Sequence, residues 1–391
     1  MTRPVQGVRG TVLRWAREAQ GFSIDDVAKL MKREPGAIAA WEDDADEMGP
    51  TYAQLEELAY RHYKRPLAAF FLPNPPKETS LEQDFRTLPG KEIEALAPDT
   101  RYHVRLGRAY QISLEELNEG ENQSERKIFQ DMRVSTDSDV AQSAVAIRAY
   151  LQVSRSDQIG WDSSDLALKR WRSAVEDAGV FVFKNTFKQK GISAFCLTDP
   201  QFPVIYLNNG TAKTRQVFSL FHELSHILLS MNSITKLDQS YISSLPAAGR
   251  RIEQFCNSLA AEILIPSDDF SAQLGTSNDF SDNRVQFLAS RYAVSREAVL
   301  RRLLDLGLVE QSHYEEKSKQ WAEEAEAAAR TGGGGNYYYT KAAYLGNAYL
   351  KLVFQRHYQG RITTDQVGDY LGVKTKYIPR FEELALGSPA S

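Results

Sequence analysis

The sequence predicts an α+β protein that is predominantly helical, with an N-terminal helical bundle, a central domain containing a small three-stranded sheet, and a helical C-terminal tail. Two observations lead to this fold class. Apolar residues recur at helical spacing through most of the 391 residues. Three short runs rich in β-branched and aromatic residues, each bounded by turn residues, occur between positions 179 and 209: GVFVFK, ISAFCLT and PVIYLNN.

Composition and charge place the chain among soluble globular proteins. Hydrophobic residues make up 42% of it, charged residues 25%, and the formal net charge is −4. That balance excludes a polycation that binds nucleic acid through its overall charge, so any DNA contact needs a local basic patch. The sequence has two cysteines, Cys196 and Cys256, and neither a signal-peptide core nor an apolar run of 18 residues. We therefore expect a cytoplasmic protein without membrane contacts.

Residues 1–76 form the first predicted unit, a bundle of short helices. Ser23 followed by Asp26 predicts a helix N-cap. The stretch resembles the helix-turn-helix domain of Xre/Cro-type repressors, with FSIDDVAKLM as the first helix of the motif and EPGAIAAWE as the recognition helix. We expect one small core, formed by Leu13, Ala16, Ile24, Val27, Ala28, Leu30, Ile38 and Trp41.

The charge of this unit leaves its partner open. Residues 34–50 contain no Lys or Arg, and phosphate contacts need cations. DNA binding through residues 1–76 and binding of a protein instead are both compatible with the sequence. The same segment, 34–50, is acidic and contains Glu34, Glu42, Asp43, Asp44, Asp46 and Glu47.

A proline-rich stretch from Pro66 to Pro76 then predicts an extended linker.

Residues 77–160 are predicted to be a helical connecting region, and residues 161–310 the domain that carries the chemistry. In this domain a helical pattern precedes the three strands. The segment TRQVFSLFHELSHILLS follows them, and its apolar composition predicts a buried helix. In such a layout the last strand can pair with an extended peptide while the helix presents ligands beneath it.

The predicted buried helix contains His-Glu-Leu-Ser-His, an HExxH motif. Residues four apart share a helix face, so His222 and His226 can both reach one Zn²⁺ ion. Glu223 points beside that face, where it can accept a proton from water instead of binding the metal. Two core histidines satisfied by hydrogen bonds are the alternative. It is the weaker one, because burying two histidines and a glutamate without a partner is costly.

A third ligand is expected from the helical pattern AAGRRIEQFCNSLAAEILIP downstream. It offers Glu253 and Glu262, which are nine residues apart and therefore face nearly opposite sides of a helix. Only one of them can reach the metal, and periodicity does not choose between them.

The segments FSLFHELSHILL and IEQFCNSLAAEILIP together resemble the ImmA/IrrE (DUF955) family of metallopeptidases. The resemblance extends to the strands before them and to the N-terminal Xre-like unit. It implies a zincin-like fold in which Zn²⁺ is held by His222, His226 and Glu253, and in which Glu223 is the catalytic base. Glu253 is chosen because it precedes the Asn257 pattern as the third ligand does in that family. An oxyanion donor is not identified, and Tyr206 and Tyr241 are candidates only.

The remainder of the chain is predicted to be helical. Residues 283–309 resemble a winged-helix-like unit, which can be a nucleic-acid contact, a cradle for an acidic partner, or a helical brace. We favour the brace, because charge runs are usually solvated faces. Residues 315–391 are expected to comprise a charged helix, a glycine hinge at 332–335 and a small helical tail. The basic unit carries Arg284, Arg291, Arg296, Arg301 and Arg302.

Three functions are compatible with these features. The first is a zinc-dependent regulatory metalloendopeptidase that cleaves a transcriptional repressor in a stress, phage or mobile-element response. The second is a non-cleaving Xre-type regulator or antitoxin that binds a partner such as a toxin. The third is a structural zinc protein, with Cys256 or Glu262 as a fourth ligand. The intact Glu223 favours the first, because a binding module needs no catalytic base.

Overall fold

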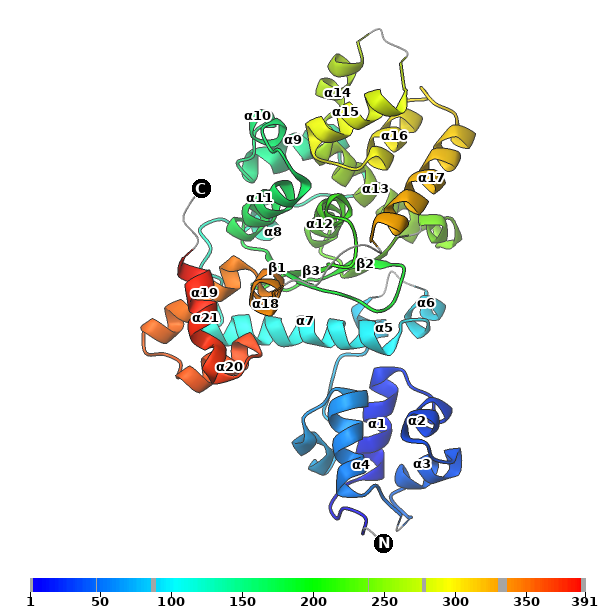
Figure 1. Cartoon of the computed structure of the whole chain (residues 1–391), viewed down its shortest axis with the longest axis vertical. Coiled ribbons are helices and arrows are strands. Elements are labelled where there is room, and N and C mark those ends of the chain that lie inside the picture. The colour runs from blue at the N-terminus through cyan, green and yellow to red at the C-terminus, as the bar shows by residue number, and fades with distance from the viewer. Residues whose placement is uncertain are drawn as a thin grey trace. The chain divides into compact units, whose positions relative to one another are not determined.

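The computed structural model of the protein describes residues 3–46, 48–85, 89–237, 239–275, 279–329 and 336–387. The chain forms two compact units, each described here by itself (Figure 1). The first comprises residues up to 106 together with 188–190, and the second comprises residues 107–187 and those from 191 onwards. The predicted glycine hinge at 332–335 and the acidic Glu47 lie outside the described residues.

The first unit is a bundle of short helices, as its sequence pattern predicts. The predicted N-cap is confirmed, since the Asp26 amide donates to Ser23 Oγ at 3.1 Å and the Ser23 amide donates to Asp26 at 2.9 Å. The predicted core is buried or partly buried, except that Leu30 is 41% exposed. The helices are α1 Gly10–Gln20, α2 Ile24–Met31, α3 Pro35–Trp41, α4 Tyr52–Glu56, the π-helix η1 Glu57–Tyr63, the 3-10 helix η2 Leu67–Phe71, α5 Leu81–Asp84, α6 Gly90–Glu94, and the first half of α7 Pro98–Leu117.

Two acidic residues of this unit have structural roles. Glu42 is buried and accepts two hydrogen bonds from the guanidinium of Arg17, at 2.7 and 2.8 Å. The carboxylate of Asp44 accepts from the Gly10 amide at 2.7 Å, at the N-terminus of α1. The acidic character of residues 34–50 is thus partly explained by folding. The two helices expected for the helix-turn-helix motif coincide with α2 and α3, and the motif itself stays a prediction.

The second unit contains a sheet with helices on both faces (Figure 1). Its core is continuous from α8 to α17. The helices are the second half of α7, α8 Ile128–Asp131, α9 Val140–Tyr150, α10 Arg155–Ile159, α11 Ser164–Asp177, α12 Lys213–Leu228, the 3-10 helix η3 Gln239–Ser244, α13 Ala247–Leu264, α14 Ser267–Leu274, α15 Asp282–Tyr292, α16 Arg296–Asp305, α17 Gln311–Ala329, α18 Tyr337–Leu345, α19 Asn347–Tyr358, α20 Thr364–Leu371, the 3-10 helix η4 Thr375–Tyr377 and α21 Ile378–Leu386.

The sheet has four strands, so the prediction of three strands was wrong. The order is β1-β3-β2-β4, with β1 parallel to β3 and the other neighbours antiparallel. The missed strand, β4, comes after α12 and has only four residues, which is too short a run for its alternation to predict a strand. The strand expected to be last, β3, lies inside the sheet, and β1 and β4 are the edges. The strands are β1 Phe181–Asn185, β2 Ile192–Leu197, β3 Val204–Asn208 and β4 Ser233–Lys236.

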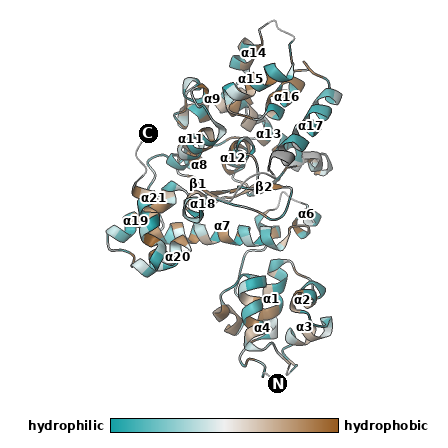
Figure 2. Ribbon diagram, viewed as in Figure 1, coloured by the Kyte–Doolittle hydropathy of each residue, from teal (hydrophilic) through white to brown (hydrophobic). Residues whose placement is uncertain are grey.

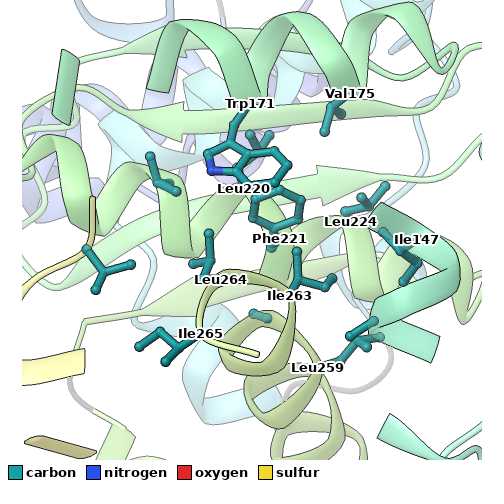
Figure 3. Close-up of a cluster of buried hydrophobic side chains, with 14 of the residues drawn as sticks. Ile147, Trp171, Val175, Leu220, Phe221, Leu224, Leu259, Ile263, Leu264 and Ile265 are labelled. Carbon is teal, nitrogen blue, oxygen red and sulfur yellow. The ribbon is translucent and has the colours of Figure 1, made fainter. Parts of the chain in front are cut away.

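Helix α12 lies against one face of this sheet and is buried along most of its length. The ring of Trp171 from α11 meets the ring of Phe221 edge to face, with centroids 4.8 Å apart. Figure 3 shows Phe221 and Leu224 of α12 facing Ile263 of α13 across the same core. Close packing of these side chains fixes the position of α12, and therefore of the polar side chains that it carries.

The second half of α7 and the C-terminal helices cover the opposite face of the sheet and its β1 edge (Figure 1). The ring of Tyr110 stacks on that of Phe183 at 4.0 Å between centroids. Arg172 of α11 donates to the Ala343 carbonyl of α18 at 2.6 Å, which ties the tail to the sheet domain. Figure 2 shows the strands among the hydrophobic segments and α17 as largely hydrophilic. The tail is therefore part of the packed unit and shields one edge of the sheet.

The basic unit at 283–309 consists of α15 and α16, and its arginines have partners within the protein. Arg291 pairs with Asp269 at 3.2 Å and Arg296 with Glu324 at 2.7 Å, while Arg302 pairs with Glu262. Arg301 pairs with Asp305 of its own helix, and Arg284 donates to a backbone carbonyl. These contacts agree with a helical brace. Among the described residues, none of the helices combines the length and apolar character needed to cross a bilayer.

Candidate metal centre

The HExxH motif lies in the second half of α12, and its polar residues are buried. The exposed fraction is 1% for His222 and 0% for both Glu223 and His226. Apolar neighbours on α12 pack into the core described above, which leaves the two histidines on the face directed toward α13. Burying three ionisable side chains on one helix is costly unless they share a partner, so the site needs a chemical explanation.

Three donor groups converge at this face. His226 Nε2 lies 3.1 Å from His222 Nε2, and the Glu253 carboxylate oxygens lie 3.3 Å from His222 Nε2 and 3.4 Å from His226 Nε2. Two ligand atoms bound to one Zn²⁺ in tetrahedral geometry are separated by about 3.3 Å, given bonds of about 2.05 Å. The spacing of these donors therefore fits a single zinc ion.

Glu253 and Glu262, between which periodicity did not choose, lie in different environments. Glu253 belongs to the His222–His226 cluster, whereas Glu262 accepts hydrogen bonds from the Ser267 amide at 2.8 Å and from Arg302. Among the described residues the cluster has three members, and neither Cys256 nor Glu262 joins it. Three protein donors are typical of a catalytic zinc site, which keeps one coordination position for water or substrate.

The surroundings of Glu253 keep it ionised. Burial alone would raise the pKa of its carboxyl, but the adjacent rings of His226 and His222 hold that pKa far below its ordinary value. Its Oε2 atom also accepts a hydrogen bond from the Tyr241 hydroxyl at 3.2 Å. An anionic carboxylate beside two imidazoles is the donor set that borderline metals such as Zn²⁺ prefer.

Of the two candidate oxyanion donors, the structure brings only Tyr241 to the centre. Tyr206 stacks on Phe195 at 4.9 Å between centroids and near Tyr110, on the sheet face opposite α12. Its hydroxyl is therefore separated from the cluster by the sheet. Tyr241 lies in η3, between β4 and α13, and contacts Glu253 directly.

Glu223 does not belong to the donor cluster. Both of its carboxylate oxygens accept hydrogen bonds from hydroxyls of β4: Thr235 Oγ1 lies 2.5 Å from Oε1, and Ser233 Oγ contacts Oε2. Sequence reasoning missed both residues. The signal was the alternation Ser-Ile-Thr directly after the motif helix, which places the two hydroxyls on one face once this segment is recognised as a strand.

The fixed position of β4 depends on both neighbours of the strand. It pairs with β2 on one side, and the guanidinium of Arg215 on α12 donates to the Lys236 carbonyl at 3.1 Å. Ser193 of β2 also donates to the Thr235 carbonyl at 3.2 Å. The strand is thus held against α12, with the Ser233 and Thr235 hydroxyls directed at Glu223.

Comparison with known proteins agrees with this arrangement over part of the chain. Residues 175–304 match the Peptidase_M78 family, described as the IrrE N-terminal-like domain. The matched region runs from the end of α11 into α16 and includes the HExxH motif and Glu253. Among curated proteins, none matches the chain. The family match supports the ImmA/IrrE resemblance and indicates a metallopeptidase-like domain.

Proposed function

We propose that the protein is a zinc-dependent regulatory metalloendopeptidase. The observation that carries the proposal is the buried triangle of His222, His226 and Glu253, with spacings of 3.1–3.4 Å, next to a glutamate that is not part of it. A structural site would require a fourth protein ligand, and a plain core would not assemble these charges. The family match to residues 175–304 gives independent support.

Each residue of the centre has a role in this proposal. Zn²⁺ held by the three donors would supply a Lewis acid that polarises a peptide carbonyl and acidifies water. Glu223 accepts the proton of the attacking water and passes it to the leaving amine. Tyr241, whose hydroxyl contacts Glu253, is a candidate donor to the oxygen on which negative charge develops.

The sheet edge at β4 is the proposed site for an extended substrate. An edge strand can pair with a peptide through its backbone, and β4 is also the strand nearest to Glu223. The other edge, β1, is covered by α18, where Tyr344 meets Thr186 with hydroxyls 2.9 Å apart. The sequence analysis expected the last predicted strand, β3, to pair with the peptide. Because β3 lies inside the sheet, we propose β4 for this role instead.

For the substrate we propose a transcriptional repressor controlling a stress, phage or mobile-element response. The proposal follows the family resemblance, in which such repressors are cleaved, and the presence of an Xre-like unit in the same chain. The retained Glu223, with both oxygens held by hydroxyls, favours hydrolysis over the binding of a toxin. Under this proposal the N-terminal unit recognises the repressor, its DNA site, or both.

The test compares wild type with Glu223→Gln in cells that encode the protein. The variant should fold and keep its zinc, because Glu223 is not a ligand, but removal of a general base typically costs ~10²–10⁴ in rate. The candidate repressor is followed by immunoblot under DNA damage or phage challenge. Glu115→Gln, on the exposed side of α7, is the matched control. Normal loss of the repressor in a zinc-loaded Glu223→Gln strain would overturn the enzyme proposal.

A further inference from the structure

We propose that Ser233 and Thr235 are positioning residues for Glu223: two hydroxyls on the edge strand that hold the catalytic base in the orientation its reaction requires. This inference rests on the proposed function and assigns a role to residues outside the HExxH motif and its third ligand. Its basis is the pair of hydrogen bonds from these hydroxyls to the two oxygens of one carboxylate.

The register of the sheet explains why both hydroxyls reach the same side chain. Ser233 pairs with Cys196 and Thr235 with Ala194, and both of those β2 residues belong to the core beneath α12. Paired residues of antiparallel strands share a face, so the two hydroxyls also point toward α12. Ile234 lies between them and pairs with Phe195 on the opposite face.

A β-bulge fixes this register at the end of β4. The pairing passes from Ala194–Thr235 to Ile192–Lys236, so Ser193 is an extra residue in β2. The Ser193 hydroxyl donates to the Thr235 carbonyl at 3.2 Å, which anchors the backbone of the residue whose side chain contacts Glu223. The second hydroxyl, Ser233 Oγ, lies 3.5 Å from Cys196 Sγ. Residues of β2 therefore contact both Thr235 and Ser233 and help to fix their positions.

The burial of the three groups makes the arrangement specific. Glu223 is 0% exposed, Ser233 2% and Thr235 4%. A buried carboxylate without donors would be costly, and the two hydroxyls supply a hydrogen-bond donor to each of its oxygens. Each carboxylate oxygen has two acceptor positions; besides the two hydroxyls the Cys196 thiol also reaches this carboxylate, which still leaves a position that can accept a proton from water. The two hydroxyls thus orient Glu223 without blocking its role as a base.

The arrangement also links substrate binding to catalysis. In the proposed function the free backbone edge of β4 pairs with a peptide, while the side chains of Ser233 and Thr235 on the same strand hold Glu223. A substrate that orders this strand therefore also orders the base. Loss of either hydroxyl should therefore weaken the binding of a ligand that gives a proton to Glu223. It should leave the binding of the metal unchanged.

The experiment uses the full-length protein loaded with Co²⁺ in place of zinc and acetohydroxamic acid as the probe. A hydroxamic acid that binds such a metal through its oxygens gives its O–H proton to a nearby carboxylate, so its affinity reports on Glu223 without any peptide substrate. Binding is followed through the visible absorption of Co²⁺. Metal content of each variant is measured separately.

We expect Thr235→Val and Ser233→Ala each to weaken hydroxamate binding about tenfold, the value of one hydrogen bond to a charged group, with unchanged metal content. Thr235→Ser restores the hydroxyl and should bind within about twofold of wild type. Ser219→Ala is the matched control, since Ser219 is a buried hydroxyl of α12 with no hydrogen-bond partner among the described residues. A general packing defect would not be rescued by serine at 235.

The outcomes separate this inference from the proposed function. A wild-type protein that takes up no divalent metal contradicts the proposed function itself. Equal hydroxamate affinity in wild type, Thr235→Val and Ser233→Ala, with metal bound in all three, overturns only the positioning role. Failure of metal-loaded wild type to bind the probe also overturns it, because Glu223 would then not be placed to accept a proton at the metal. If Ser233→Ala does not fold, the Val and Ser variants at 235 decide the question.

Discussion

The Nε2 atoms of His222 and His226 lie 3.1 Å apart at the centre of the second unit. Two unprotonated imidazole nitrogens at this distance would turn their lone pairs toward each other, so a proton or a metal ion must lie between them. The adjacent carboxylate of Glu253 makes a cation the more favourable partner. The metal is therefore the first property to test.

Protein purified without chelators should contain about one zinc per chain by elemental analysis. The variant combining His222→Ala and His226→Ala should contain none. Because the metal binds the folded state, chelation should also lower the melting temperature. The corresponding loss of stability is ~4 kcal/mol for metal present at a thousandfold excess over its dissociation constant. Protein without any divalent metal and with an unchanged melting temperature on chelation would refute the assignment.

The two glutamates of α13 should respond differently to truncation. Glu253→Ala removes a donor of the cluster and should release the metal. Glu262→Ala should keep the metal and lower the free energy of unfolding instead, because Arg302 and the Ser267 amide lose their acceptor. Loss of a buried charge partner costs ~3–5 kcal/mol. Metal content and urea unfolding of both variants check the prediction, and the reverse pattern would contradict it.

The site was predictable where it depends on local sequence and not where it depends on strand register. His222 and His226 share a face by helix geometry alone, and the predicted helix is α12. The choice of Glu253 over Glu262 required the family resemblance, because both occupy one helix. Ser233 and Thr235 reach Glu223 only through pairing of β4 with β2 across 37 residues of sequence, from Cys196 to Ser233. A four-residue strand carries too little pattern to reveal that pairing.

The Arg17–Glu42 pair should be a major source of stability in the first unit. Both side chains are buried, and two hydrogen bonds of 2.7 and 2.8 Å join them. Glu42→Ala leaves the guanidinium buried without its carboxylate, at a cost of ~3–5 kcal/mol. Glu34→Ala, an exposed acid of the same segment, should change stability by no more than about 0.5 kcal/mol. Circular dichroism during urea unfolding compares the two, and equal effects would show that the Arg17–Glu42 pair contributes no more to stability than an exposed acid does.

Lys184 should make the stability of the second unit depend on pH. It is 7% exposed on β1, and burial, together with the charges of Arg172 and Lys213, lowers its pKa from 10.5 to about 7. Between these two values the unfolded chain binds a proton that the folded chain does not, so this residue reduces stability progressively as the pH falls from 10.5 to 7. Below pH 7 both states are protonated, and the reduction stays constant.

Replacing this lysine by methionine should therefore stabilise the protein, most strongly at pH 6. The difference between the unfolded and folded pKa of Lys184 sets an upper bound of about 5 kcal/mol on this gain in unfolding free energy. The loss of the hydrogen bond from Lys184 Nζ to Gln216, at 3.4 Å, offsets about 1 kcal/mol of that gain. The difference in unfolding free energy between Lys184→Met and wild type should shrink steadily toward pH 10.5. Lys351→Met, at an exposed position of α19, controls for the change of residue type. A difference that is the same at pH 6 and pH 10 would show that Lys184 is charged in the folded protein throughout this range.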